Sequence, residues 1–129
     1  MSFRWSGDRG QSLVEFALVL PVLALLLLGI IDVGRILSAN LIVSQAARDA
    51  ARYASIGQPD ATVQQAAQTD AQTLSAVTVD IQPPSSGPRT SGSNVTVTVA
   101  DGVSLFDPLL AGLLGSPFQV QSQVTMLVE

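Results

Sequence analysis

The sequence predicts an α+β protein in which one long N-terminal helix packs by its outer half on a small antiparallel sheet, with one or two short helices. Two observations lead to this class. A helical pattern runs from Gln11 to Ile56, apolar at first and amphipathic later. The second half of the 129-residue chain then alternates apolar and polar residues with period two, as strands do, in three stretches: 77–81, 94–99 and 118–128.

The first part of the predicted helix is long and apolar enough to cross a membrane. From Gln11 to Ile31 the only charged residue is Glu15. At ~1.5 Å rise per residue, a helix of this length spans a hydrocarbon core of ~30 Å. Pro21 removes one helical hydrogen bond and is expected to kink or loosen the helix, although prolines are also ordinary in membrane helices.

Glu15 is the exception within the apolar segment. An ionised acid near the centre of a span costs about 2.5–3.5 kcal/mol, and less near its end. The sequence offers no nearby cationic partner inside the segment. Either Glu15 lies in the first turn, reaches the headgroups and is favoured by the helix dipole, or its partner comes from another molecule.

The outer part of the helix has one apolar face. Its small or apolar residues alternate in steps of four and three, at Ile36, Val43, Ala47, Ala50 and Ala54. Small residues four apart let a sheet or another backbone approach closely. Arg48, Asp49 and Arg52 are expected on a solvated flank, with a weak Asp49–Arg52 pair.

Glycine and proline end this helix at Gly57-Gln58-Pro59. From Ser12 to Ile56 the helix would be about 67 Å long. A second, surface helix is expected over 60–76, with Asp60 as N-cap and a thin stripe formed by Val63, Ala66 or Ala67, Ala71 and Leu74.

Two strands and an exposed hairpin loop are expected next. The strands are 77–81 and 94–99, the latter with its valines inward and its threonines outward, and the loop is the Pro-, Ser- and Gly-rich stretch 83–93. A short apolar helix is expected after them, with Asp107 as N-cap, Pro108 as first helical residue and Gly115 as C-terminal stop. This helix would be a core plug or a contact surface. The last strand should bury one face, formed by Phe118, Val120, Val124, Met126 and Val128.

Composition excludes several function classes. The chain has no Cys and no His, and its six basic residues are all Arg. Thiolate or imidazole metal sites, Cys nucleophiles, His-based triads and Lys-dependent catalysis are therefore absent, so we expect no enzyme, metal or cofactor. The arginines are scattered and the net charge is -4, which argues against a nucleic-acid partner.

The charges around the span indicate its orientation. Arg4 and Arg9 precede it against one acid, Asp8, and only Arg35 follows it closely, so the positive-inside bias places the N-terminus in the cytoplasm. The alternative is a secretory signal peptide cut after Ala39. Against it, the apolar region exceeds the ~7–15 residues usual for such signals.

A polar leader that ends at Gly10, followed by Glu15 as the fifth residue after it, resembles a prepilin-type signal. The run from Asp8 to Arg35, and Leu105-Phe106-Asp107-Pro108 near the end of the chain, resemble the TadE-like family, minor pilins (pseudopilins) of the tight-adherence (Flp) pilus system. The middle of the chain, residues 58–93, matches only in general character.

The resemblance implies a function and a set of partners. A prepilin peptidase would cut between Gly10 and Gln11, and Glu15 would then meet the new amine of Gln11 on a neighbouring subunit. The expected partners are that peptidase, other pilin and minor pilin subunits, the inner-membrane assembly platform and membrane lipid. The protein would reside in the inner membrane as a single-pass protein with its C-terminal domain outside the cytoplasm, and be extracellular in an assembled pilus.

The expected organisation is a leader (1–10), a long helix (11–56, with 11–31 in the membrane) and a small extracytoplasmic α+β domain (57–129). The competing function is a membrane-anchored or secreted binding domain that does not polymerise. An enzyme is a third class, but the chain lacks most of the usual catalytic groups.

Overall fold

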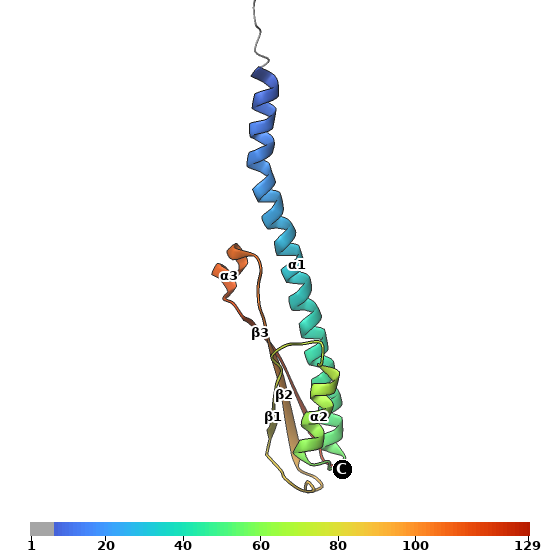
Figure 1. The fold of residues 1–129 in the computed structure, drawn as a ribbon. Coiled ribbons are helices and arrows are strands. Elements are labelled where there is room, and N and C mark those ends of the chain that lie inside the picture. The colour runs from blue at the N-terminus through green and yellow to red at the C-terminus, as the bar shows by residue number, and fades with distance from the viewer. Residues whose placement is uncertain (1–6) are drawn as a thin grey trace, which may run out of the picture.

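The computed structural model describes residues 7–129. The elements follow in the order α1 (Gly7–Ser55), α2 (Asp60–Asp70), β1 (Thr78–Gln82), β2 (Asn94–Val103), α3 (Pro108–Leu114) and β3 (Phe118–Leu127). Figure 1 shows the N-terminal half of α1 projecting beyond a small domain in which the sheet packs against its C-terminal half. The predicted α+β class is confirmed.

The long helix α1 is continuous over 49 residues, which corresponds to about 74 Å at ~1.5 Å per residue. It begins four residues earlier than the predicted start at Gln11, because no proline lies between Gly7 and Pro21 and the helix propagates through the polar residues that precede the apolar segment. It passes through Pro21 without a break and curves gently (Figure 1). A kink localised at Pro21 stays a prediction.

The predicted stop of α1 at its C-terminal end is confirmed. Gly57 has φ +81°, a conformation that a side chain would strain, and Pro59 follows. The Gly57 amide donates to the Ala54 carbonyl at 3.1 Å, and the Gln58 amide donates to that of Tyr53 at 3.2 Å. These bonds satisfy carbonyls that a helix end would otherwise leave unpaired.

The sheet has three antiparallel strands in the order β1-β2-β3. The prediction for β1 was correct to within one residue, and the alternation predicted for β3 is confirmed. β2 runs to Val103 rather than ending at Val99, because its alternation continues through Asp101. Asp101 faces inward, is 3% exposed and accepts a hydrogen bond from the Ala76 amide at 3.0 Å.

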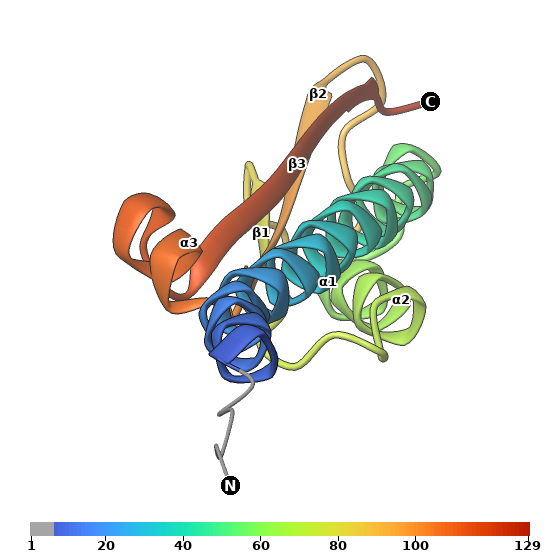
Figure 2. The same cartoon turned by 90° about the horizontal axis from the view of Figure 1, so that it is seen from above.

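The core lies between the inner face of the sheet and the outer half of α1. Figure 2 shows the sheet and α2 on different sides of α1. The alanines of α1 let both approach: the predicted face is buried except at Ile36, which is half-buried, and further alanines beside it are buried too. Fully buried are Val43, Ala46, Ala47, Ala50, Ala51 and Ala54, against Val95, Val97 and Val99 of β2. The flank is not paired as predicted, because no ion pair within 4 Å joins Asp49 to Arg52 in the described chain.

The second helix differs from its prediction at both ends. α2 ends at Asp70 rather than Ala76, and Pro59, not Asp60, occupies the N-cap position. The chain leaves the helix because the Ala76 amide is held by Asp101 and Thr78 pairs with Ala100 across the sheet. Tertiary contacts thus override helix propensity. The predicted buried stripe is correct for Val63, Ala67 and Ala71.

The third helix begins and ends as predicted. The Asp107 carboxylate accepts a hydrogen bond from the Leu109 amide at 2.8 Å, Pro108 is the first helical residue, and Gly115 follows the last. None of its residues is buried, however. The core-plug alternative is therefore wrong, since the alanines of α1 and the valines of the sheet already fill the core.

Candidate functional site

The predicted cleavage and assembly residues lie in the first turns of α1. Gly10, Gln11 and Glu15 are all exposed. The Gln11 side-chain nitrogen Nε2 donates to Glu15 Oε1 at 3.1 Å, so positions 11 and 15 face the same side of the helix. Glu15 therefore has a neutral partner in its own chain, which the sequence analysis missed. No cation lies within 4 Å of its carboxylate among the side chains of residues 10–129.

Gly10 has no structural role within the described fold. A Cβ added at this position would meet no heavy atom within 4 Å. Glycine in a helix costs about 1 kcal/mol relative to alanine. The fold thus gives no reason for a glycine at position 10.

The apolar part of α1 is uncovered. Most of its large side chains are more than half exposed, including Leu18 at 70% and Ile30 at 69%. Within residues 10–129 one helix, α1, is long and apolar enough to cross a membrane. Its most apolar stretch of 18 residues has a mean hydropathy of 2.7, and no residue of this stretch is buried. A signal sequence can have the same length and composition. A surface this apolar requires a bilayer or other proteins to cover it.

Directly after the apolar segment, one turn of α1 holds a loop that lies far away in the sequence. The Asp32 side chain is fully buried, and its Oδ2 accepts hydrogen bonds from the backbone amides of Phe106 (2.8 Å) and Asp107 (2.7 Å). Asp32 Oδ1 lies 3.6 Å from Arg35 Nη1, an ion pair too long to be a hydrogen bond. We call Asp32, Arg35 and the loop 104–107 the Asp32–Arg35 cluster.

Arg35 makes the second half of this attachment. Its Nη1 donates to the Ser104 carbonyl at 2.7 Å, and its guanidinium lies 4.3 Å from the centre of the Phe106 ring. This is a cation–π geometry, and an Arg over an aromatic face contributes about 0.5–1 kcal/mol at exposed sites. The two side chains thus bind the loop through its backbone and through its aromatic ring.

Gly29, one turn before Asp32, lets the loop come close to the helix. A Cβ at this position would lie 3.2 Å from Asp107 Oδ2 and 3.8 Å from Leu110 Cδ1. Unlike Gly10, Gly29 therefore has a structural reason within the fold. Sequence analysis treated Arg35 only as a charge that follows the span and did not single out Asp32. The spacing of three from Gly29 to Asp32 and Arg35 marks one side of the helix, but it does not indicate that the loop 104–107 binds there.

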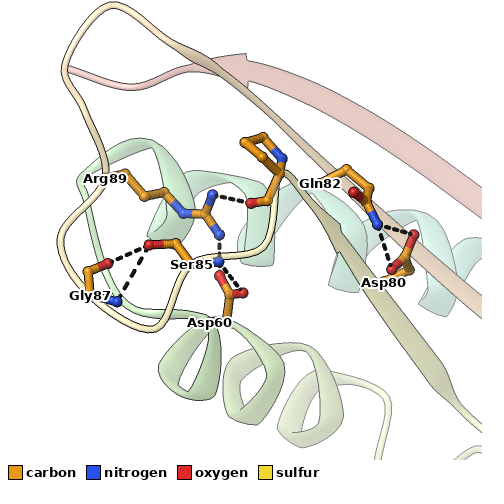
Figure 3. Close-up of polar contacts among 7 residues, drawn as sticks. Asp60, Asp80, Gln82, Ser85, Gly87 and Arg89 are labelled. Atoms are coloured by element: carbon orange, nitrogen blue, oxygen red, sulfur yellow. Dashed lines mark hydrogen bonds and ion pairs between the residues drawn. The ribbon is translucent and has the colours of Figure 1, made fainter.

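A second polar cluster anchors the hairpin loop between β1 and β2 (Figure 3). The Arg89 side chain is only 3% exposed, pairs with Asp60 Oδ1 and donates to the Pro83 carbonyl at 2.8 Å. Asp60 Oδ2 accepts a hydrogen bond from the Ser85 amide at 2.6 Å. The expectation of an exposed hairpin loop was therefore wrong at Arg89, because Asp60 at the start of α2 draws that side chain inward.

These clusters bind backbone and do not form a reaction centre. Within residues 10–129 no group of three or more acidic side chains is close enough together to hold a metal ion. An open cavity of about 560 Å³ lies between α1 and α2, lined by residues that include Arg52, Tyr53 and Asp70. Hydroxyl and carboxylate side chains both line it, but within residues 10–129 no hydrogen bond joins them, and the Thr69 hydroxyl donates to the Gln65 carbonyl at 2.8 Å instead.

The comparison with protein families singles out α1. The family model described as TadE-like protein matches residues 10–52, about a third of the chain. The matched part begins at Gly10 and includes Glu15, the apolar segment and both charged residues of the Asp32–Arg35 cluster. The resemblance inferred from the sequence is confirmed over these residues, and it points to a protein associated with the tight-adherence pilus. A search of curated proteins found no match to the chain.

Proposed function

We propose that the chain is a minor pilin (pseudopilin) of a tight-adherence (Flp) pilus, made as a membrane precursor, cut after Gly10 by a prepilin peptidase and then assembled through α1. The observation that best supports this proposal is the position of the family match in the chain. It covers residues 10–52, which is the helix with the uncovered apolar surface, and not the sheet. The chain would act as a building part of an assembly and would catalyse no reaction.

The proposed organisation follows the helix. Residues 1–10 are the leader, 11–56 the long helix with 11–31 in the membrane, and 57–129 the domain outside the cytoplasm. The inner membrane, with the N-terminus in the cytoplasm, is the proposed location. Of the charges behind this orientation, Arg4 and the side chains of Asp8 and Arg9 lie outside the described part of the chain.

The position of the cut within α1 has a physical consequence. The bond between Gly10 and Gln11 lies in the first turn of the helix. A peptidase would have to unwind that turn to reach the bond. Gly10 lowers the free energy of unwinding by about 1 kcal/mol relative to alanine, and it presents no side chain to the enzyme. This explains a glycine that the fold itself does not need.

Glu15 would provide the contact between subunits. Cleavage turns the backbone nitrogen of Gln11 into a charged amine, and in an apolar helix bundle an unpaired ion costs several kcal/mol. Glu15 lies one turn further on, exposed, and its carboxylate faces no cation among the side chains of residues 10–129. We expect it to pair with the Gln11 amine of a neighbouring subunit.

Cleavage after Ala39 as a secretory signal fits the geometry poorly. Ala39 lies inside α1 and is 3% exposed in the core. Removal of everything before it would take away Asp32 and Arg35, and with them the hydrogen bonds that hold the loop 104–107. The geometry thus favours a mature chain that keeps α1.

The test is the mass of the mature N-terminus in a strain with the pilus machinery. We expect wild-type protein to begin at Gln11 and Gly10→Leu to stay at full length. Gly34→Leu is the matched control, because Gly34 is also a helical glycine of α1 with nothing within 4 Å of an added Cβ. It should be cut normally. Normal cutting of Gly10→Leu, or a wild-type chain that begins at Asn40, would contradict the proposal.

A further inference from the structure

We infer that α3, together with Phe106, is a lipid-binding surface that lies in the outer interface of the bilayer and fixes the height of the domain above it. The inference goes beyond the role in the pilus. It depends on membrane insertion of α1, and it does not depend on cleavage or assembly. We call Phe106, Leu109, Leu113 and Leu114 the α3 surface.

The α3 surface is apolar and uncovered. Leu113 is 81% exposed, Leu109 65%, Phe106 61% and Leu114 46%, and no residue of α3 is buried. Between Pro108 and Leu114 the helix has no charged or polar side chain. Its leucines thus contribute little to the core of the domain, and several large apolar side chains exposed on one short element mark a contact with a membrane or a protein.

The height of α3 along α1 favours the membrane. Leu110 of α3 would be 3.8 Å from a Cβ at Gly29, which is two residues before the end of the predicted span at Ile31. Two residues correspond to about 3 Å along the helix axis. Helices that lie in the interface bury their apolar side chains about 5–10 Å into the boundary between headgroups and acyl chains, so α3 lies at the depth where such helices bind.

The arrangement of the elements agrees with this depth. α3 is at the end of the domain from which the N-terminal half of α1 projects, and it stands to one side of α1 (Figures 1 and 2). At the same height the side chains of α1 are also exposed and apolar, with Leu26 at 62% and Ile30 at 69%. The α3 surface therefore lies level with the outer end of the apolar surface of the span.

The Asp32–Arg35 cluster holds α3 at this height. Asp32 binds the amides of Phe106 and Asp107, and Asp107 caps the first turn of α3 through the Leu109 amide. The Asp32 carboxylate at the end of the span thus binds two backbone amides of the loop, and the Asp107 carboxylate binds a third amide, in the first turn of α3. Two contacts with the bilayer, α1 and α3, would restrict how far the domain tilts against the membrane.

The chain offers a direct test because it has no cysteine. Full-length protein with a single cysteine in place of Leu113 is labelled with an environment-sensitive fluorophore and placed in lipid nanodiscs, one chain per disc. Quenching is measured with a spin label attached near the headgroup end of the acyl chain and, separately, with aqueous iodide. Leu26→Cys serves as the control inside the span, and Gln64→Cys as the exposed control on α2.

We expect the label at position 113 to lose emission to the lipid quencher, as at position 26, and to be protected from iodide. The label at position 64 should show the opposite. Leu109→Cys, one turn earlier on the same face of α3, should repeat the result for position 113. Leu113 is so exposed that its replacement should leave the fold intact, and far-ultraviolet circular dichroism checks this.

Three results would overturn the inference. If the label at position 113 is quenched by iodide, as at position 64, while the label at position 26 is quenched by lipid, then α1 spans the membrane but α3 lies in water. If position 113 is protected from both quenchers, protein covers α3. If position 26 is itself open to iodide, α1 is not inserted, and the inference fails together with the membrane part of the proposed function.

Discussion

Replacement of Asp32 by alanine should detach the loop 104–107 from α1. The Asp32 side chain is fully buried and accepts two backbone hydrogen bonds, at 2.7 and 2.8 Å. Hydrogen bonds to a charged group contribute about 1.5–3 kcal/mol each. Because Asp32→Ala removes two of them, we expect it to lower the free energy of unfolding by about 3–6 kcal/mol. Asp32→Asn keeps one acceptor oxygen and should lose roughly half as much.

The assay is hydrogen exchange of the full-length chain in mild detergent, followed at the amides of Phe106 and Asp107. Because about 1.4 kcal/mol corresponds to a factor of ten, exchange at these amides should accelerate by about 10²- to 10⁴-fold in Asp32→Ala. Asp49→Ala is the matched control, since Asp49 lies on the same helix, is half-buried and makes no ion pair within 4 Å among the side chains of residues 10–129. It should change stability by about 0.5 kcal/mol or less. Equal exchange rates in the two alanine variants would refute the role assigned to Asp32.

Two further predictions concern the packing of the domain. Ala50→Leu should overpack the contact between α1 and its neighbours and lower the free energy of unfolding by about 1–3 kcal/mol, whereas Arg48→Ala on the exposed flank should change it little. Thermal melts of both variants decide this, and equal melting temperatures would mean that the alanine stripe is not packed. Arg89→Met should leave Asp60 without its cation and cost about 3–5 kcal/mol in urea unfolding, and an unchanged midpoint would show that the pair contributes nothing.

The sequence was sufficient for the elements whose pattern is local. The long helix, the three strands and the short helix capped by Asp107 follow from periodicity and from the residues at their ends. The end of α2 was wrong because local propensity favours a longer helix, and only the contact between Asp101 and the Ala76 amide shows why the chain turns earlier.

The two polar clusters could not be predicted from the sequence for the same reason, because contacts between residues far apart in the chain form them. Asp32 and the amides it binds are 74 and 75 positions apart, and Arg89 is 29 positions from Asp60. Nothing in a local pattern pairs residues at such distances. For Gly10 and Glu15 the sequence shows more than the fold does. Their local spacing suggested a role, whereas the structure shows only the hydrogen bond between Gln11 and Glu15. The partners proposed for them belong to other molecules.

The most direct test of assembly through Glu15 compares the membrane and sheared-filament fractions of wild-type protein, Glu15→Gln and Glu15→Ala, with the N-terminus sequenced in each fraction. Glu15→Gln keeps an oxygen that can accept the hydrogen bond from Gln11 and removes only the charge. We expect both variants to be inserted and mostly cut after Gly10, yet to be lost from the filament fraction, because the buried amine would lack its counter-charge. Normal incorporation of cut Glu15→Gln would contradict the account and leave Glu15 as a tolerated charge at the edge of the membrane.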